Sequence, residues 1–175
     1  MAKPIIWLAS KAALEVLTDF EKKYQYNTEA YSRSPYDPDD NRPEFDATFG
    51  VKADRSGLTV LEKVGNTTVL KVHGSLTPTF ARWHAWYPGL VTSYEAIKDA
   101  ISILQEVGET RVLMDFATGG GAVRGLDTVT TAMTRAQRGG LRFHGHTDSS
   151  AFSAGYWLMA GCDELTGSRM AEIGS

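Results

Sequence analysis

The stretch Leu113-Met-Asp-Phe-Ala-Thr-Gly-Gly-Gly-Ala-Val-Arg-Gly125 is the part of the chain that decides the fold. Its first residues belong to the mostly apolar segment Arg111–Phe116, which predicts a buried strand. Three consecutive glycines follow, and they predict a turn because glycine adopts backbone conformations that other residues avoid. A strand that runs directly into a glycine turn is a unit typical of α/β folds.

A helix is predicted on the far side of the glycines. Four apolar residues repeat there at helical spacing and are expected to face inward: Leu126, Val129, Met133 and Ala136. Gly139-Gly140 predicts the end of this helix. A short strand at 141–144 and a further helix that begins near Ser153 complete this half of the chain.

Strands and a helix also precede the stretch. Leu58–Val64 and Thr67–Val72 flank Gly65-Asn66, which is a signal for a two-residue hairpin. Thr92-Ser-Tyr-Glu95 matches a capping box and predicts the start of a helix that ends at Gly108. Strands that alternate with helices of this length predict an α/β layered fold with parallel pairing in the main sheet.

Residues 1–56 differ from the rest of the chain. Apolar residues at helical spacing predict an amphipathic helix: Leu14, Leu17, Phe20 and Tyr24. Tyr31–Pro43 combines prolines with acidic residues and predicts an extended arm. We therefore divide the chain into a helix and arm at 1–56 and a domain at 57–175. The N-terminal part suits either a surface helix with a loop or an arm that contacts other subunits or a scaffold.

Composition excludes several classes of protein. The 175 residues carry a net charge of −3, so no basic surface is expected and nucleic acid is not predicted as a partner. The one cysteine, Cys162, cannot form an internal disulfide and is expected to be a small buried residue on a helix. The apolar run Pro4–Ala9 is too short for a signal peptide or a membrane span, so a cytoplasmic protein is expected.

Ser153 and the glycines are the candidate functional residues. A serine at a helix start is most often only a cap, but Ser153 is followed by the small residues Ala154 and Gly155, which allow a substrate to approach. The glycines fit neither a P-loop nor a dinucleotide-binding pattern. A hydroxyl nucleophile and approachable backbone N–H donors are what acyl transfer requires. Together they predict a serine hydrolase.

Histidine-based sites fit less well. In an α/β-hydrolase the acid and the histidine follow the serine, whereas no histidine follows Ser153. We therefore expect His73, His144 and His146 to be structural. His144 and His146 alternate and could join Asp148 around a metal ion. A metal site is nevertheless not predicted, because a third well-spaced ligand is missing. No cofactor is predicted.

From about residue 69 to 175 the chain resembles the signal peptide peptidase A-like family of serine peptidases, especially its phage branch, the head maturation (prohead) proteases. Four segments carry the resemblance in order: Val69–Gly74, Gly89–Tyr94, Met114–Gly121 and Ser153–Trp157. The third usually reads Asp-x-x-Ser-Pro-Gly-Gly in the family; here Thr118 replaces the serine and Gly119 the proline. The resemblance implies a Clp/crotonase-like fold of repeated strand-strand-helix units.

The resemblance also implies a mechanism. Ser153 is the expected nucleophile, and the backbone N–H of Gly120 or Gly121 would join that of Ala154 in an oxyanion hole. The family's general base is a lysine that follows the serine, but the last lysine here is Lys98. We therefore expect either a truncated form of a longer peptidase, which we favour, or a short protein that has kept the fold and lost the chemistry. In both cases we expect no peptidase activity from the 175-residue chain alone.

Three functions follow as hypotheses. The first is a serine endopeptidase, a homo-oligomer that cleaves scaffold and capsid polypeptides in the host cytoplasm or the phage procapsid. The second is a non-catalytic structural module of a procapsid or virion with the same fold. The third is an acyl-CoA enzyme of the crotonase type, which needs no serine nucleophile and therefore does not explain Ser153.

Overall fold

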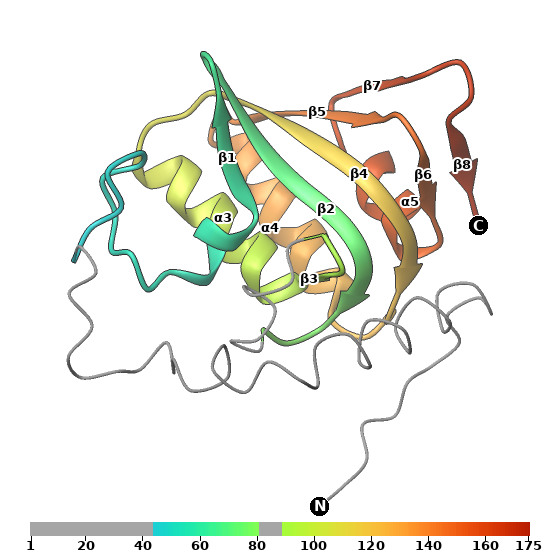
Figure 1. The fold of residues 1–175 in the computed structure, drawn as a ribbon, viewed down its shortest axis with the longest axis horizontal. Helices are drawn as coiled ribbons and strands as arrows, with labels where there is room; N and C mark the ends of the chain where they lie inside the picture. Colours follow the sequence, from blue (N-terminus) through green and yellow to red (C-terminus); the bar gives the residue numbers. More distant parts are fainter. Residues whose placement is uncertain (1–43, 81–88) are drawn as a thin grey trace, which may run out of the picture. The chain divides into compact units, whose positions relative to one another are not determined.

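The computed structural model describes residues 44–80 and 89–175. Within these ranges the chain forms a mixed α/β fold with eight strands and three α-helices (Figure 1). In chain order the elements are the 3-10 helix η1 (Ser56–Thr59), β1 (Leu61–Val64), β2 (Thr67–Thr77), β3 (Val91–Ser93), α3 (Tyr94–Glu106), β4 (Arg111–Gly121), α4 (Leu126–Arg138), β5 (Arg142–Thr147), β6 (Ser150–Phe152), α5 (Ala154–Ala160), β7 (Glu164–Gly167) and β8 (Glu172–Gly174). The predicted α/β class is confirmed.

The main sheet has the strand order β1-β2-β4-β5-β7. β1 and β2 form an antiparallel hairpin around Gly65-Asn66, in which Val64 pairs with Thr67. The pairs β2–β4, β4–β5 and β5–β7 are all parallel. β3 pairs with β2, β6 with β4, and β8 with β6. The predicted hairpin and the predicted parallel pairing are therefore both confirmed.

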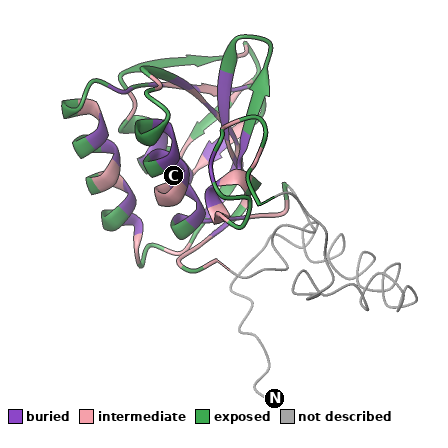
Figure 2. Cartoon of the chain, turned by 90° about the vertical axis from the view of Figure 1, so that its left-hand side faces the viewer, coloured by how far each residue is buried: buried purple, intermediate pink, exposed green. Residues whose placement is uncertain are grey.

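The two faces of the sheet differ in polarity. One face packs against the helices and carries fully buried side chains from the three central strands: Leu70, Val72, Val112, Met114, Phe116 and Phe143. The buried stripes of the helices turn toward this face (Figure 2). Each of these side chains contributes roughly 1.5–3 kcal/mol when it is removed from water. The other face carries half-buried polar residues, because successive side chains of a strand point to opposite sides.

The sequence predicted the inward face of α4 correctly. Its buried residues are the four apolar residues that repeat at helical spacing: Leu126, Val129, Met133 and Ala136. The helix ends at Arg138, immediately before Gly139-Gly140. Local periodicity is therefore sufficient to orient this helix against the sheet.

The start of α3 differs from the prediction. The N-cap is Ser93, whose hydroxyl accepts a hydrogen bond from the Ala96 N–H at 3.0 Å. Thr92 instead donates from Oγ1 to the His73 carbonyl at 2.8 Å and joins β3 to β2. Glu95 accepts a hydrogen bond from the Phe80 N–H. The predicted capping box that starts at Thr92 is therefore wrong by one residue, because Thr92 is engaged by the sheet.

The segment before β1 is fastened to α3. Asp99 accepts hydrogen bonds from Arg55 Nε at 2.7 Å and from the Gly57 N–H at 2.8 Å. Burial alone would raise the pKa of Asp99, but Arg55, Gly57 and Ser56 together hold this pKa below its usual value. Gly57 lies so close to the helix that a Cβ would be 2.4 Å from the Ala100 nitrogen.

Contacts divide the chain into two units, Met1–Arg42 and Pro43–Ser175. The predicted amphipathic helix and the predicted arm at 31–43 lie outside the described residues. Residues 44–56, which we grouped with the arm, include Val51, a buried member of the hydrophobic core. None of the helices in the described ranges is both long and apolar enough to cross a lipid bilayer.

Candidate active site

Ser153 has an unusual backbone conformation. It lies between β6 and α5 with φ 51° and ψ −121°, and no other non-glycine residue within 44–80 and 89–175 has a positive φ. Its N–H donates to the Gly174 carbonyl at 2.9 Å, and its carbonyl accepts from the Trp157 N–H at 3.1 Å. Such a conformation costs about 1–3 kcal/mol in a residue with a Cβ. The hydrogen bonds on both sides hold Ser153 in this conformation.

The Ser153 hydroxyl does not serve as a helix cap. The residue occupies the N-cap position of α5, but its side chain forms no capping hydrogen bond, and the residue is exposed. No side chain in the described part of the chain is hydrogen-bonded to this hydroxyl. The usual structural role of a serine at a helix start is therefore not observed here.

The glycines approach Ser153 directly. Gly119, Gly120 and Gly121 are the last residues of β4, so the predicted turn is wrong: the strand continues through them. Gly120 has φ 94°, and a Cβ on it would lie 2.6 Å from Ser153 Cβ. A side chain at Gly120 would therefore collide with Ser153. The structure thus brings two of the predicted site residues into contact.

Thr118 connects the glycines to the rest of the site. It is buried, and its Oγ1 donates to the Gly74 carbonyl at 2.5 Å and accepts from the Gly120 N–H at 2.9 Å. Its methyl carbon packs against α5, where a Cβ on Gly155 would lie 2.3 Å from Thr118 Cγ2. Sequence analysis missed this role. The signal available was a hydroxyl residue two positions before a glycine, which is a common local hydrogen-bonding pattern.

The two candidate glycine donors differ in environment. The Gly120 N–H is occupied by Thr118, and Gly120 is buried. Gly121 is exposed. The third candidate donor, Ala154, is the first residue of α5, where backbone N–H groups have no partner within the helix.

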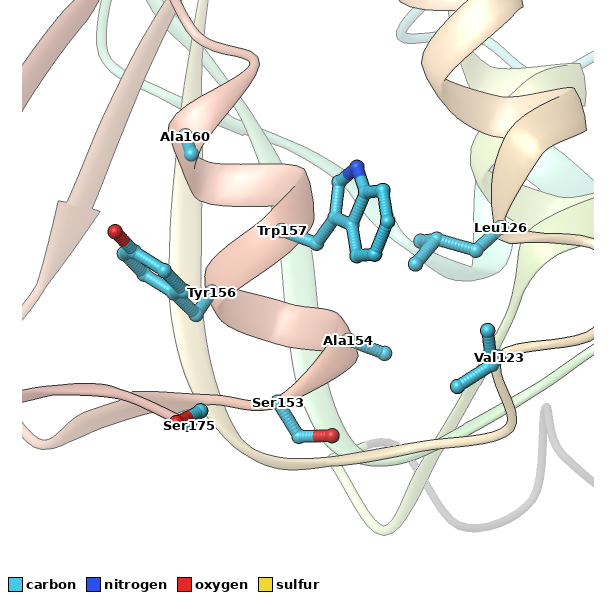
Figure 3. A pocket seen from close by; sticks show the side chains of 8 residues that line it. All are labelled: Val123, Leu126, Ser153, Ala154, Tyr156, Trp157, Ala160 and Ser175. Atoms are coloured by element: carbon cyan, nitrogen blue, oxygen red, sulfur yellow. The ribbon is translucent and has the colours of Figure 1, made fainter.

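A hollow of about 490 Å³ lies beside Ser153. Most of its lining is apolar; the lining residues are Val123, Leu126, Ser153, Ala154, Tyr156, Trp157, Ala160 and Ser175. In Figure 3 the side chains of Trp157 from α5 and Leu126 from α4 point toward each other, and Ser153 stands at the start of α5. The side chains of Val123 and Trp157 are 67% and 62% exposed, which is unusual for large apolar groups. An exposed apolar lining of this kind suits a ligand or a partner protein.

The described histidines lie away from Ser153, on the polar face of the sheet. His73 Nε2 donates to Asp115 Oδ2 at 2.8 Å, and this hydrogen bond holds the pKa of Asp115 below its usual value. His144 Nε2 and His146 Nδ1 both contact Thr166 Oγ1, at 2.8 and 2.7 Å. None of the three is hydrogen-bonded to Ser153. Within the described ranges no group of three or more side chains is arranged to hold a metal ion.

Cys162 follows α5 and is mostly shielded from water. Its Sγ lies 3.7 Å from Met114 Sδ, and burial raises the pKa of the thiol to about 12. A thiol with so high a pKa is protonated near neutral pH and is a poor nucleophile. Cys162 therefore does not compete with Ser153 as the reactive residue.

Comparison with models of known protein families gives no match, and no curated protein matches the chain. The function must therefore be argued from the residues around Ser153.

Proposed function

We propose that the protein is a serine peptidase in which Ser153 is the nucleophile. The observation that carries the proposal is the strained backbone of Ser153 at a strand-to-helix junction, with Gly120 packed against it. A serine held in such a turn presents its hydroxyl away from the backbone, as in the nucleophile elbow of other hydrolases. Strained residues of this kind concentrate at functional sites.

The chemistry is acyl transfer. Ser153 Oγ attacks the carbonyl carbon of a peptide bond and loses its proton to a general base. The carbonyl oxygen becomes an oxyanion, which accepts hydrogen bonds from the N–H groups of Ala154 and of a glycine in β4; each donor is worth about 3 kcal/mol of the barrier. The protonated base then gives its proton to the leaving amine, and water hydrolyses the acyl-enzyme.

We extend the proposal to the type of peptidase, a signal peptide peptidase A-like enzyme with a Clp/crotonase-like fold. Three of the four resembling segments support it by their positions: Val69–Gly74 lies in β2, Met114–Gly121 in β4 beside it, and Ser153 next to Gly120. Its proposed substrates are scaffold and capsid polypeptides during phage head maturation, and its proposed assembly is a homo-oligomer. The hollow beside Ser153 offers a place for an apolar side chain of the substrate.

A fluorophosphonate tests the nucleophile. Ser153 Oγ forms a bond to phosphorus, the P–F bond breaks, and fluoride leaves while the hydroxyl proton goes to a base. Because no described side chain is hydrogen-bonded to Ser153 and a general base is worth roughly 10²–10⁴-fold, an added small amine should act as an external base. We expect modification of Ser153, measured by peptide mass spectrometry, at a rate that rises with the concentration of neutral amine.

Matched controls make the result specific. Ser153→Ala should abolish labelling, whereas Ser149→Ala, at an exposed serine nearby, should leave it unchanged. Labelling should also disappear in urea, since an unfolded serine lacks the oxyanion donors. Equal labelling of folded and unfolded chain, with or without amine, would exclude Ser153 as an activated nucleophile.

A second candidate function is a non-catalytic structural module of a procapsid or virion. The observation that favours it is the Ser153 hydroxyl, to which no base is hydrogen-bonded in the described part of the chain. This function predicts no fold-dependent labelling at any amine concentration. It also predicts that Ser153→Ala leaves particle assembly unchanged.

A further inference from the structure

The Thr118 side chain contacts three of the segments around the candidate oxyanion hole. Its hydroxyl bridges the Gly74 carbonyl in β2 and the Gly120 N–H in β4, and its methyl carbon packs against Gly155 in α5. We propose that Thr118 is a positioning residue that makes Gly121, and not Gly120, the oxyanion donor of β4. The inference rests on the proposed role of Ser153 as nucleophile.

The Gly120 N–H is already engaged by Thr118. Thr118 Oγ1 accepts from this N–H while it donates to the Gly74 carbonyl, so the hydrogen bond is anchored on the side of β4 that faces β2. Gly120 is buried. An oxyanion could use the Gly120 N–H only by displacing the Thr118 hydroxyl, which would lose a hydrogen bond in a buried place.

The Gly121 N–H has a different direction from that of Gly120. Successive N–H groups of a strand point to opposite edges, and the Ala122 N–H donates to the Leu76 carbonyl of β2 at 2.9 Å. The Gly121 N–H therefore points to the other edge of β4. On that edge β4 pairs with β6, which leads into Ser153. Gly121 is also exposed, so a substrate can reach it.

Threonine suits position 118 because both its hydroxyl and its methyl group are used. The hydroxyl holds the Gly120 N–H, and the methyl group fills the space against Gly155, where a Cβ would lie 2.3 Å from Thr118 Cγ2. Serine would keep the hydroxyl and lose the methyl contact. Valine would keep the methyl contact and lose the hydroxyl. The two substitutions therefore separate the two functions of the side chain.

The test uses Thr118→Val and Thr118→Ser in the full chain, with Thr134→Val as a matched control on the exposed side of α4. In Thr118→Val the Gly120 amide should exchange with solvent about tenfold faster, because its one hydrogen bond to a side chain is lost. The maximal rate of amine-assisted labelling of Ser153 should fall about tenfold, with unchanged affinity for the fluorophosphonate. Thr118→Ser should restore both quantities to within about twofold, and Thr134→Val should change neither.

Amide chemical shifts identify the donor in the unsubstituted protein. When Ser153 carries the phosphonyl group, the Gly121 and Ala154 amide protons should move downfield, and the Gly120 proton should stay in place. A downfield shift of Gly120 instead of Gly121 would overturn the inference, and this measurement needs no variant that might fold poorly.

Different results would refute the nucleophile role of Ser153 and the positioning role of Thr118. If the unsubstituted chain labels at Ser153 and Thr118→Val labels at the same rate, the positioning role is refuted while the nucleophile stands. Unchanged exchange of the Gly120 amide in Thr118→Val refutes the positioning role as well. If Ser153 in the folded chain never labels, the proposed function fails, and the inference that rests on it fails too.

Discussion

Replacing Ser153 by glycine should make the protein more stable while it removes the nucleophile. Ser153 has φ 51° and ψ −121°, a region that glycine enters freely and that costs other residues about 1–3 kcal/mol. Its side chain makes no capping hydrogen bond, so little is lost with the hydroxyl. Glycine costs about 0.5–1 kcal/mol through the flexibility of the unfolded chain. The net stabilisation of Ser153→Gly is therefore expected to be about 1 kcal/mol.

The assay is urea and thermal unfolding of three variants beside the unsubstituted chain. A stabilisation of about 1 kcal/mol raises the melting temperature by roughly 2–4 °C in a chain of this size. Ser153→Ala keeps the Cβ and the strain, so its stability should stay within about 0.5 kcal/mol of the original. Ser149→Gly is the control, because Ser149 lacks a positive φ and glycine there should destabilise.

The difference in stability between Ser153→Gly and Ser153→Ala tests whether the backbone of Ser153 is strained. If Ser153→Gly is no more stable than Ser153→Ala, the backbone of Ser153 is not strained. Backbone strain would then no longer single out Ser153 as the nucleophile. A higher urea midpoint with an unchanged slope would show that the effect is on stability and not on the compactness of the unfolded chain.

Two further predictions concern titratable groups away from the site. The pKa of Asp99 is lowered in the folded protein, so its interactions with Arg55 stabilise the fold above the unfolded pKa and are lost as the pH falls below about 4. Asp99→Asn should therefore flatten the fall of the urea midpoint with decreasing pH. Parallel plots of urea midpoint against pH for the two proteins would contradict the assignment. Cys162, whose pKa is raised to about 12, should resist iodoacetamide at pH 8 in the folded chain and react in urea; rapid alkylation of the folded chain would show that the thiol is accessible.

Local patterns in the sequence were sufficient for much of the fold. The buried face of α4 and the hairpin at Gly65-Asn66 were predicted correctly, because helical spacing and turn residues act over a few neighbouring positions. The capping box at Thr92 failed by one residue, because Thr92 Oγ1 bonds to His73 in another strand. A local pattern cannot register such a competing partner.

The sequence grouped Ser153 with the glycines, and Gly120 does lie against Ser153, but the local geometry was not predicted. The glycines at 119–121 were expected to form a turn, yet they continue β4, because Gly120 and Gly121 stay paired with Ser75 and Leu76 of β2. The positive φ of Ser153 depends on hydrogen bonds to Gly174 and Trp157, which no short motif encodes. The bridging role of Thr118 likewise depends on a carbonyl that lies 44 residues away in the sequence.

The strand order of the main sheet bears on how the protein folds during synthesis. β1, β2, β4, β5 and β7 lie side by side in the order in which the ribosome produces them. Each new strand can therefore add to the outer edge of a sheet that has already formed, and none has to insert between two earlier strands. Domains that emerge N-terminal end first at about 5–20 residues per second can use such stepwise growth. β4, which carries the glycines, can thus pair with β2 before Ser153 leaves the ribosome.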